Sequence, residues 1–266
     1  MDAPKDEVDL PQNSGAASWR EIATVVGTAI VEFRKMWTVA APRIGEVIRR
    51  VAAEFPPAYR LALIEIAKRG WYIDQQMGLS MPPKLAAALA REESRHEAES
   101  ELTAYFISRL DAIELEICER FPQRAHIIEP AFAAHRAGQY VLSIPVFLAQ
   151  ADGICYEKIR AYHFMRDRGS NQPPATARHA RSDEHDLWNA IVLSPLSAVV
   201  PLNMNKNERG PDFLGLNRHT VMHGDSLDYG TEANSLKAIS FLNYVSQVLT
   251  RKNFKERLEE NRNVAT

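Results

Sequence analysis

The chain has 266 residues, of which 45% are hydrophobic and 25% are charged, and it contains only two cysteines. This composition allows a buried core, and it excludes a disordered chain and a scaffold held by disulfides. The net charge of −2 argues against bulk electrostatic coating of nucleic acid, so contact with RNA or DNA needs a local basic patch. Residues 1–18 have no apolar signal segment and no apolar stretch is long enough for a bilayer, which predicts a cytoplasmic protein without membrane contact.

The N-terminal half begins with a polar stretch, residues 1–17, which we interpret as a flexible tail. From Ser18 onward, apolar residues recur at the spacing of a helix, and we expect short helices up to Gly70. One long helix is predicted from about Met81 to Arg120, because proline is tolerated in its first turn and apolar residues then recur with a period near 3.6. We assign residues 18–121 to an accessory helical region.

The C-terminal half begins at Pro122, which breaks the long helix and marks the predicted domain boundary. A stretch over 168–181 is rich in Pro, Gly, Ser, Asn and Arg and is predicted to be a mobile loop. The helix over 139–166 is apolar nearly all round, which places it at the centre of a bundle. Residues 122–250 form the predicted bundle, residues 251–266 a charged tail, and the fold class is all-α. The predicted helices cover residues 123–137, 139–166, 183–199 and 212–223, with a last one from about Thr231.

The densest group of side chains suited to phosphate chemistry lies in the segment Asn217-Arg218-His219-Thr220-Val221-Met222-His223-Gly224. Arginine offers a planar fork to phosphate oxygens, and histidine is the side chain best suited to proton transfer near neutral pH. Residues five apart differ by about 140° around a helix. Because arginine is long and His223 stands where the helix should end, before Gly224, both side chains can still reach one phosphate.

This Arg-x4-His motif, preceded by Asn217 and placed just before the last helix of an all-α bundle, resembles the signature of the HEPN superfamily. The resemblance covers roughly residues 122–250, and the stretches 135–140 and 150–154 resemble the helix pair that packs on the motif in that family. The resemblance implies a metal-independent endoribonuclease that needs no cofactor and acts as a toxin or in antiviral defence. It further implies a homodimer in which two motifs line one cleft, with RNA as substrate and an antitoxin or defence protein as partner.

Carried over to this chain, the family's mechanism makes Arg218 and His223 the catalytic residues. Arg218 would stabilise the charge that develops on the phosphate. His223 would assist attack by the ribose 2′-hydroxyl or protonate the leaving oxygen, so that a 2′,3′-cyclic phosphate forms. Asn217 would orient the motif, with His219 in a supporting role. In one toxin subgroup a tyrosine two residues after the motif histidine is a modification site, but this chain has Asp225 there.

Two other interpretations of the motif stay open. In the first, Arg218 and His223 only stabilise the carbonyl end of a helix, and Asn217 is a helix-surface residue. In the second, the same bundle is a non-catalytic binding or sensing module in a defence complex. His219 and His223 also have the i, i+4 spacing of metal ligands, although Thr220 stands where the zinc-protease pattern needs glutamate.

Supporting residues are expected outside the motif. Asp152 lies in an apolar helix and needs a partner, for which Arg218 and His223 are the candidates, unless it points outward or meets another arginine. Glu93 and His96 form half of a di-iron motif without a second copy, which favours a solvated helix face. One basic cluster on the 168–181 loop either contacts the RNA backbone or is simply solvated; it contains Arg166, Arg168, Arg178, His179 and Arg181, of which the arginines are the candidate RNA-binding residues.

Overall fold

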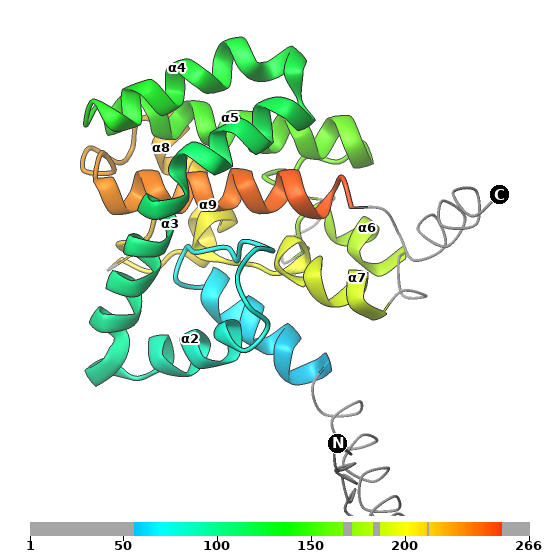
Figure 1. Ribbon diagram of the computed structural model, residues 1–266. Helices are drawn as coiled ribbons and strands as arrows, with labels where there is room; N and C mark the ends of the chain where they lie inside the picture. Colours follow the sequence, from blue (N-terminus) through cyan, green and yellow to red (C-terminus); the bar gives the residue numbers. More distant parts are fainter. Residues whose placement is uncertain (1–55, 167–171, 183–186, 212, 252–266) are drawn as a thin grey trace, which may run out of the picture. The chain divides into compact units, whose positions relative to one another are not determined.

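The computed structural model describes residues 56–166, 172–182, 187–211 and 213–251. The predicted tail over 1–17, residues 18–55 of the accessory region, Arg168 and residues 252–266 lie outside the described residues. Within the described ranges the chain forms helices and loops without a β-sheet, which confirms the all-α prediction (Figure 1). The first described helix covers residues 56–67. The longer helices that follow are α2 (Met81–Ala90), α3 (Glu92–Arg120), α4 (Ala125–Arg136), α5 (Tyr140–Ile159) and α9 (Glu232–Val248).

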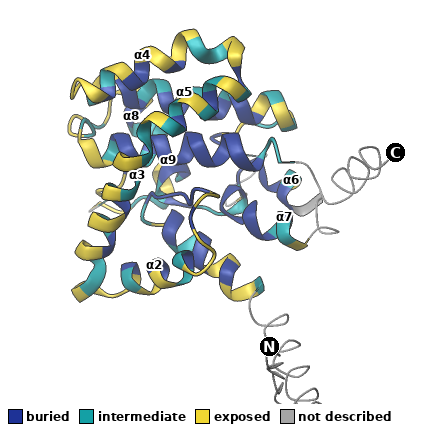
Figure 2. Ribbon diagram, in the orientation of Figure 1, coloured by how far each residue is buried: buried dark blue, intermediate teal, exposed yellow. Residues whose placement is uncertain are grey.

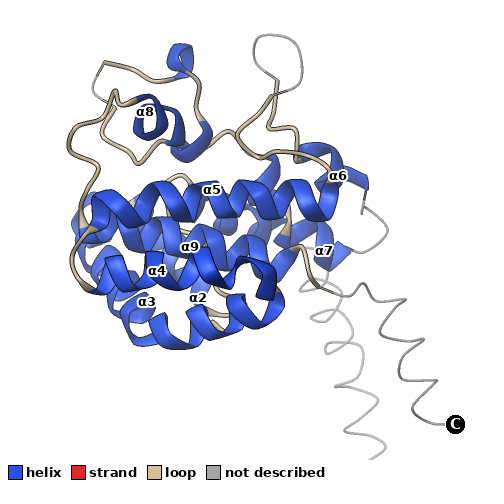
Figure 3. Ribbon diagram, turned by 90° about the horizontal axis from the view of Figure 1, so that it is seen from above, coloured by secondary structure: helices blue, strands red, loops and turns tan. Residues whose placement is uncertain are grey.

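Shorter helices connect α5 to α9. They are α6 (Ala177–Ser182), α7 (Leu187–Val192) and α8 (Arg218–His223), together with three 3-10 turns at Ser194–Ser197, Pro201–Asn203 and Lys206–Glu208. A fourth 3-10 turn, Pro122–Arg124, precedes α4. Figure 3 shows α8 within a layer of loops beside α5.

The central helix of the fold is α9, and α5 takes the place next to it (Figure 2). Every residue of α9 from Leu236 to Val248 except Lys237 is buried, whereas Val141 and Leu142 of α5 are more than half exposed. The prediction that the 139–166 helix is the centre of the bundle is therefore wrong in detail. An apolar stretch only permits deep burial, and the packing partners on all sides of α9 decide which helix is enclosed.

Polar side chains of α9 hold the surrounding elements in place. Ser235 Oγ lies 2.8 Å from His135 Nδ1 of α4 and 2.9 Å from Ser143 Oγ of α5. Gln247 Nε2 donates to Asp74 Oδ1 at 2.8 Å, and its Oε1 accepts the backbone N–H of Gln75 at 2.8 Å. Because buried polar groups are costly unless they are paired, these bonds fix the position of each neighbour around α9.

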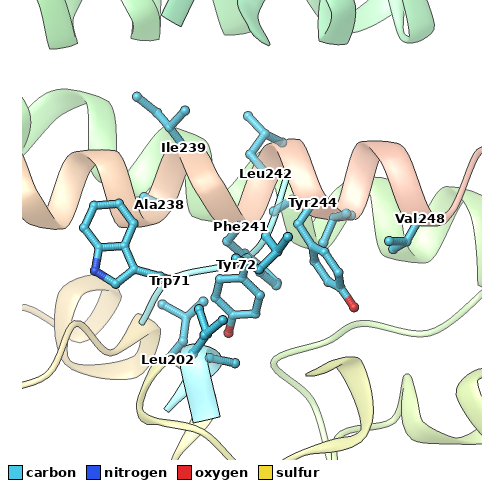
Figure 4. Close-up of a cluster of buried hydrophobic side chains, with 14 of the residues drawn as sticks. Trp71, Tyr72, Leu202, Ala238, Ile239, Phe241, Leu242, Tyr244 and Val248 are labelled. Carbon is cyan, nitrogen blue, oxygen red and sulfur yellow. The ribbon is translucent and has the colours of Figure 1, made fainter. Parts of the chain in front are cut away.

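The loop after the first described helix packs closely against the middle of α9. The Tyr72 ring lies 4.7 Å from the Phe241 ring and 5.4 Å from the Tyr244 ring, centroid to centroid (Figure 4). The neighbouring Trp71 ring stacks on Phe106 of α3 at 5.6 Å. One core thus joins residues on both sides of position 121.

The predicted domain boundary at 121 lies inside a compact unit that begins at Glu54. Arg120, the last residue of α3, donates to Ser246 Oγ of α9 at 3.3 Å, and Phe121 is fully buried. Pro122 ends a helix here, but a helix break is not a domain boundary when both sides share a core.

Further expectations about helices are wrong: of the described residues in the predicted helices over 183–199 and 212–223, only α7 and α8 are α-helical. The predicted helix from Met81 to Arg120 is two helices, because Arg91 adopts an extended conformation (ψ 138°) and side chains of the next turn bind the free carbonyls of α2. Ser94 Oγ donates to Ala88 O at 2.9 Å and Arg95 Nε to Leu89 O at 3.2 Å. The predicted 168–181 loop contains α6, whereas the start of α9 near Thr231 and the cap of α8 at Gly224 (φ 73°) are confirmed.

Candidate phosphate-handling site

The short helix α8 carries the motif, and both of its ends are fixed. At its start, Asn217 Oδ1 accepts the backbone N–H of Thr220 at 3.2 Å, which is an N-cap. At its end, Gly224 adopts the left-handed conformation, and the N–H of Asp225 returns to Thr220 O at 2.9 Å. Arg218 and His223 are therefore the first and last residues of a single, capped turn and a half of helix.

Asn217 also fastens α8 to the preceding loop. Its Nδ2 donates to Pro201 O at 2.6 Å and to Met204 O at 2.9 Å, and its Oδ1 accepts a second hydrogen bond from Arg209 Nη1 at 3.2 Å. The side chain is 1% exposed and uses its full hydrogen-bonding capacity. The alternative in which Asn217 is a helix-surface residue is therefore wrong.

Arg218 is half-buried beside α5 and the loop that follows it. Its guanidinium lies 5.7 Å from the centre of the Phe164 ring, a cation–π arrangement that orients the head group. Asp152, on α5, is 8% exposed, and its Oδ1 accepts the Phe164 N–H at 3.3 Å rather than forming an ion pair with Arg218 or His223. Burial raises the pKa of Asp152, and the backbone N–H groups of Phe164 and His163 and the charge of Arg218 oppose this effect.

His219 and His223 lie on one face of α8, with nearly parallel rings whose centroids are 6.3 Å apart. His223 is exposed, whereas His219 is half-buried and its Nε2 is enclosed without a hydrogen-bond partner. Burial lowers the pKa of His219, and the positive charges of Arg218, Arg209, His223 and Arg166 lower it further. Because burial and the neighbouring cations disfavour the imidazolium form, His219 accepts a proton less readily than a free histidine, while the surrounding cations suit contact with an anion.

The predicted RNA-binding arginines have different surroundings. Arg166 is held inside the structure: its Nη2 pairs with Glu208 Oε2 at 2.7 Å and donates to Asn203 O at 2.9 Å, and its Nη1 donates to Gln172 O at 2.6 Å. Its side chain is 10% exposed, so it supports the loops next to α8 and contributes positive charge without facing solvent. Arg178 is exposed on α6. Arg168 and the side chain of Arg181 lie outside what the structure describes.

Sequence reasoning missed two side chains of this site. Arg209 reaches Asn217, and Phe164 supports Arg218. Arg209 stands in a loop of ordinary polar composition and Phe164 follows the end of α5, so neither carries a local signal in the sequence. Only the contact of both loops with α8 brings them to the motif.

Behind these loops, the fully buried His163 forms hydrogen bonds with two neighbouring side chains. Thr176 Oγ1 donates to Leu196 O at 2.6 Å, so it accepts the N–H of His163 Nδ1 at 3.0 Å, while Asn203 Nδ2 donates to His163 Nε2 at 3.1 Å. This network requires the neutral imidazole. Burial, with a contribution from the charge of Arg166, accordingly lowers the pKa of His163 to about 3.

The other candidate sites have no support in the described residues. Within those ranges, no three His, Cys, Asp or Glu side chains come together in a way that could hold a metal ion. Glu93 and His96 are both exposed on α3, as expected for a solvated helix face. None of the described helices has the length and apolar character that a membrane crossing requires.

Comparison of the chain with models of known families, with characterised proteins and with solved structures gave no significant match. The functional argument therefore depends on the geometry of α8 and its neighbours.

Proposed function

We propose that this protein is a HEPN-type endoribonuclease that cleaves RNA without a metal ion, through attack of a ribose 2′-hydroxyl, with α8 as the catalytic element. The observation that carries the proposal is the grouping of Arg218, His219 and His223 on one capped helix, within the positive field of Arg209 and Arg166. A phosphate needs cations to offset its charge, and transesterification needs groups that accept and donate a proton. Both kinds of group are present on α8.

The proposed step is a single displacement at phosphorus. A bond forms between the 2′-oxygen and phosphorus, and the bond from phosphorus to the 5′-oxygen breaks. His223 accepts the 2′-hydroxyl proton, and the imidazolium so formed gives a proton to the leaving 5′-oxygen. His223 is exposed at the end of α8 and takes part directly, whereas the half-buried His219 has a supporting role. Arg218 offsets the charge on the phosphate oxygens.

The role in defence and the homodimer stay part of this proposal, as does the cytoplasmic location. Exposed apolar side chains on two helices that contact each other support a subunit contact: Met222 of α8 is 45% exposed, and Val141 and Leu142 at the start of α5 are 53% and 59% exposed. Grouped exposed apolar residues mark interaction surfaces more often than single ones do. Such a contact would bring a second α8 toward the first.

The experiment is RNA cleavage by the purified protein in EDTA. We expect cleavage by the wild type, and a loss of about 100-fold or more in Arg218→Ala and in His223→Ala, with an unchanged Tm. Arg60→Ala, an exposed arginine on the first described helix, is the matched control and should cleave normally. Unchanged cleavage in both α8 variants would refute the assignment, and activity that needs a divalent metal would point to His219 and His223 as ligands.

A non-catalytic binding module is the second candidate, and a separate cavity favours it. This cavity of about 430 Å³ is lined mainly by apolar side chains, among them Leu63, Ile73, Met77 and Val248. Concave, largely apolar clefts of this size are typical ligand sites. If the protein is such a binding module, RNA stays intact under every condition and an apolar ligand raises the Tm of the wild type. The same ligand should not raise the Tm of Leu63→Trp, because the larger side chain fills the cavity.

A further inference from the structure

Two tyrosine rings stack on each other at the surface of the protein, at the C-terminal end of α5. The centroids of the Tyr156 and Tyr162 rings are 4.5 Å apart, and the ring planes differ by 11°. Both side chains are partly open to solvent, since Tyr156 is 41% exposed and Tyr162 is 37% exposed. Each ring covers only one face of the other, so a further planar group can extend the stack.

Positive charge accompanies the tyrosine pair. The exposed Arg160 has its guanidinium carbon 5.8 Å from the centre of the Tyr156 ring, and in the part of the chain that the structure describes no carboxylate pairs with it. The segment over 156–162 contains one acidic residue, Glu157, which already pairs with Arg124 at 3.0 Å and with Lys158 at 3.5 Å. The charge beside the rings therefore suits an anionic ligand.

Arg160 occupies a backbone position that favours glycine. It ends α5 in the left-handed region, with φ 54° and ψ 29°, and it is the only described residue other than glycine with a positive φ. Left-handed residues also follow α4 and α8, and there the chain has Gly138 and Gly224. Because a Cβ is costly in this conformation, an arginine here points to a role for its side chain.

The tyrosine pair is connected to the surroundings of Arg218. Tyr156 lies one turn of α5 beyond Asp152, about 6 Å along the helix axis, and Asp152 Oδ1 accepts the Phe164 N–H at 3.3 Å. Phe164 follows Tyr162 by two residues, which is at most about 7 Å of chain, and its ring centre lies 5.7 Å from the Arg218 guanidinium. An RNA strand of a few nucleotides that binds at Arg218 can therefore contact the tyrosine pair as well.

We propose that Tyr156, Tyr162 and Arg160 form a stacking platform that binds an unpaired base of the RNA substrate, away from the cleaved bond. Exposed aromatic rings with neighbouring cations suit a single strand, because every base has a face that can stack and every nucleotide carries a phosphate. A base inside a duplex has both faces covered by its neighbours, so the platform selects single-stranded RNA with little preference for sequence. The inference rests on the proposed function, in which α8 cleaves RNA.

The first test measures binding of a short, unstructured RNA by fluorescence anisotropy, with each ribose 2′-O-methylated so that the strand is not cut. We expect binding to weaken about tenfold in Tyr156→Ala and in Tyr162→Ala, and by less than about twofold in Tyr156→Phe, which keeps the ring. Leu115→Ala shortens a side chain on α3 that is 59% exposed, and this matched control should bind as the wild type does. Wild-type binding by both alanine variants, or equal binding of duplex RNA by the wild type, would overturn the inference.

Arg160→Gly tests the cation without a loss of stability. The Tm should not fall, because the steric cost that glycine removes is at least as large as its cost in chain entropy. Binding of the same RNA should weaken about threefold or more, since a phosphate loses its cation. A variant that is as stable as the wild type cannot lose binding through unfolding. Unchanged binding in Arg160→Gly would overturn the place of Arg160 in the platform.

Cleavage kinetics separate this inference from the proposed function. If the wild type cuts unmodified RNA, Tyr156→Ala and Tyr162→Ala should raise KM about tenfold and leave kcat within about twofold, because the platform holds substrate away from the reacting phosphate. An unchanged KM in both variants would overturn the inference and leave the nuclease assignment intact. If the wild type binds single strands through the two tyrosines and cuts no RNA, the platform is supported although the proposed function has failed.

Discussion

Removal of the Asn217 side chain should loosen α8 by an amount that follows from its four hydrogen bonds. In Asn217→Ala the helix loses its N-cap, which costs about 1 kcal/mol, and Pro201 O and Met204 O lose their donor, which costs at least about 1 kcal/mol each. The free energy of opening α8 should therefore fall by about 3 kcal/mol. Since about 1.4 kcal/mol corresponds to a factor of ten, amide exchange in this segment should accelerate roughly 100-fold.

The assay is hydrogen–deuterium exchange followed by mass spectrometry of peptides covering residues 213–224. Asn207→Ala is the matched control, because Asn207 is exposed in the same loop region, and it should leave exchange unchanged. Exchange in Asn217→Ala that is less than threefold faster than in the wild type would show that these contacts do not hold α8, and the argument for a fixed catalytic helix would fail.

Three further perturbations have defined outcomes. In the folded protein the pKa of His163 is lowered to about 3, so below the unfolded pKa of about 6.5 the unfolded state binds one more proton. As the pH is lowered from 6.5 to 3, the free energy of unfolding should therefore fall by up to about 1.4 kcal/mol per pH unit. Urea titration measures this dependence, and its slope should be shallower in His163→Gln. Arg166→Ala should lower the free energy of unfolding by about 2–3 kcal/mol through loss of the half-buried pair with Glu208, whereas Arg60→Ala should change it by less than about 0.5 kcal/mol. Gly230→Ala should displace the 225–231 loop, because an added Cβ would collide with Val141, and limited proteolysis should cut that loop faster than in the wild type.

Local sequence signals predicted the elements whose ends are set by their own residues. The apolar period gave α4 and α9, and Gly224 and Thr231 marked the end of α8 and the start of α9 as the structure has them. The break at Arg91 was missed because its cause, the binding of α2 carbonyls by Ser94 and Arg95, is a contact and not a pattern.

In the candidate site too, some residues could be predicted from local sequence and others depend on contacts between distant parts of the chain. The motif identified Arg218 and His223 because arginine and histidine are recognisable by their chemistry. The burial of Asn217, the enclosed Nε2 of His219 and the approach of Arg209 depend on loops that come from elsewhere in the chain. His219 keeps the supporting role that its spacing assigned to it, because burial and the neighbouring cations lower its pKa and its Nε2 is enclosed.

The most direct test of the account is the chemical form of the 3′ ends that the purified protein produces from RNA in EDTA, read by mass spectrometry. Attack by the 2′-hydroxyl under the control of α8 predicts 2′,3′-cyclic phosphate ends, and an uncut bond wherever the nucleotide before it is 2′-deoxy. Products that carry 3′-hydroxyl ends, or RNA that stays intact with the wild-type protein, would contradict the account.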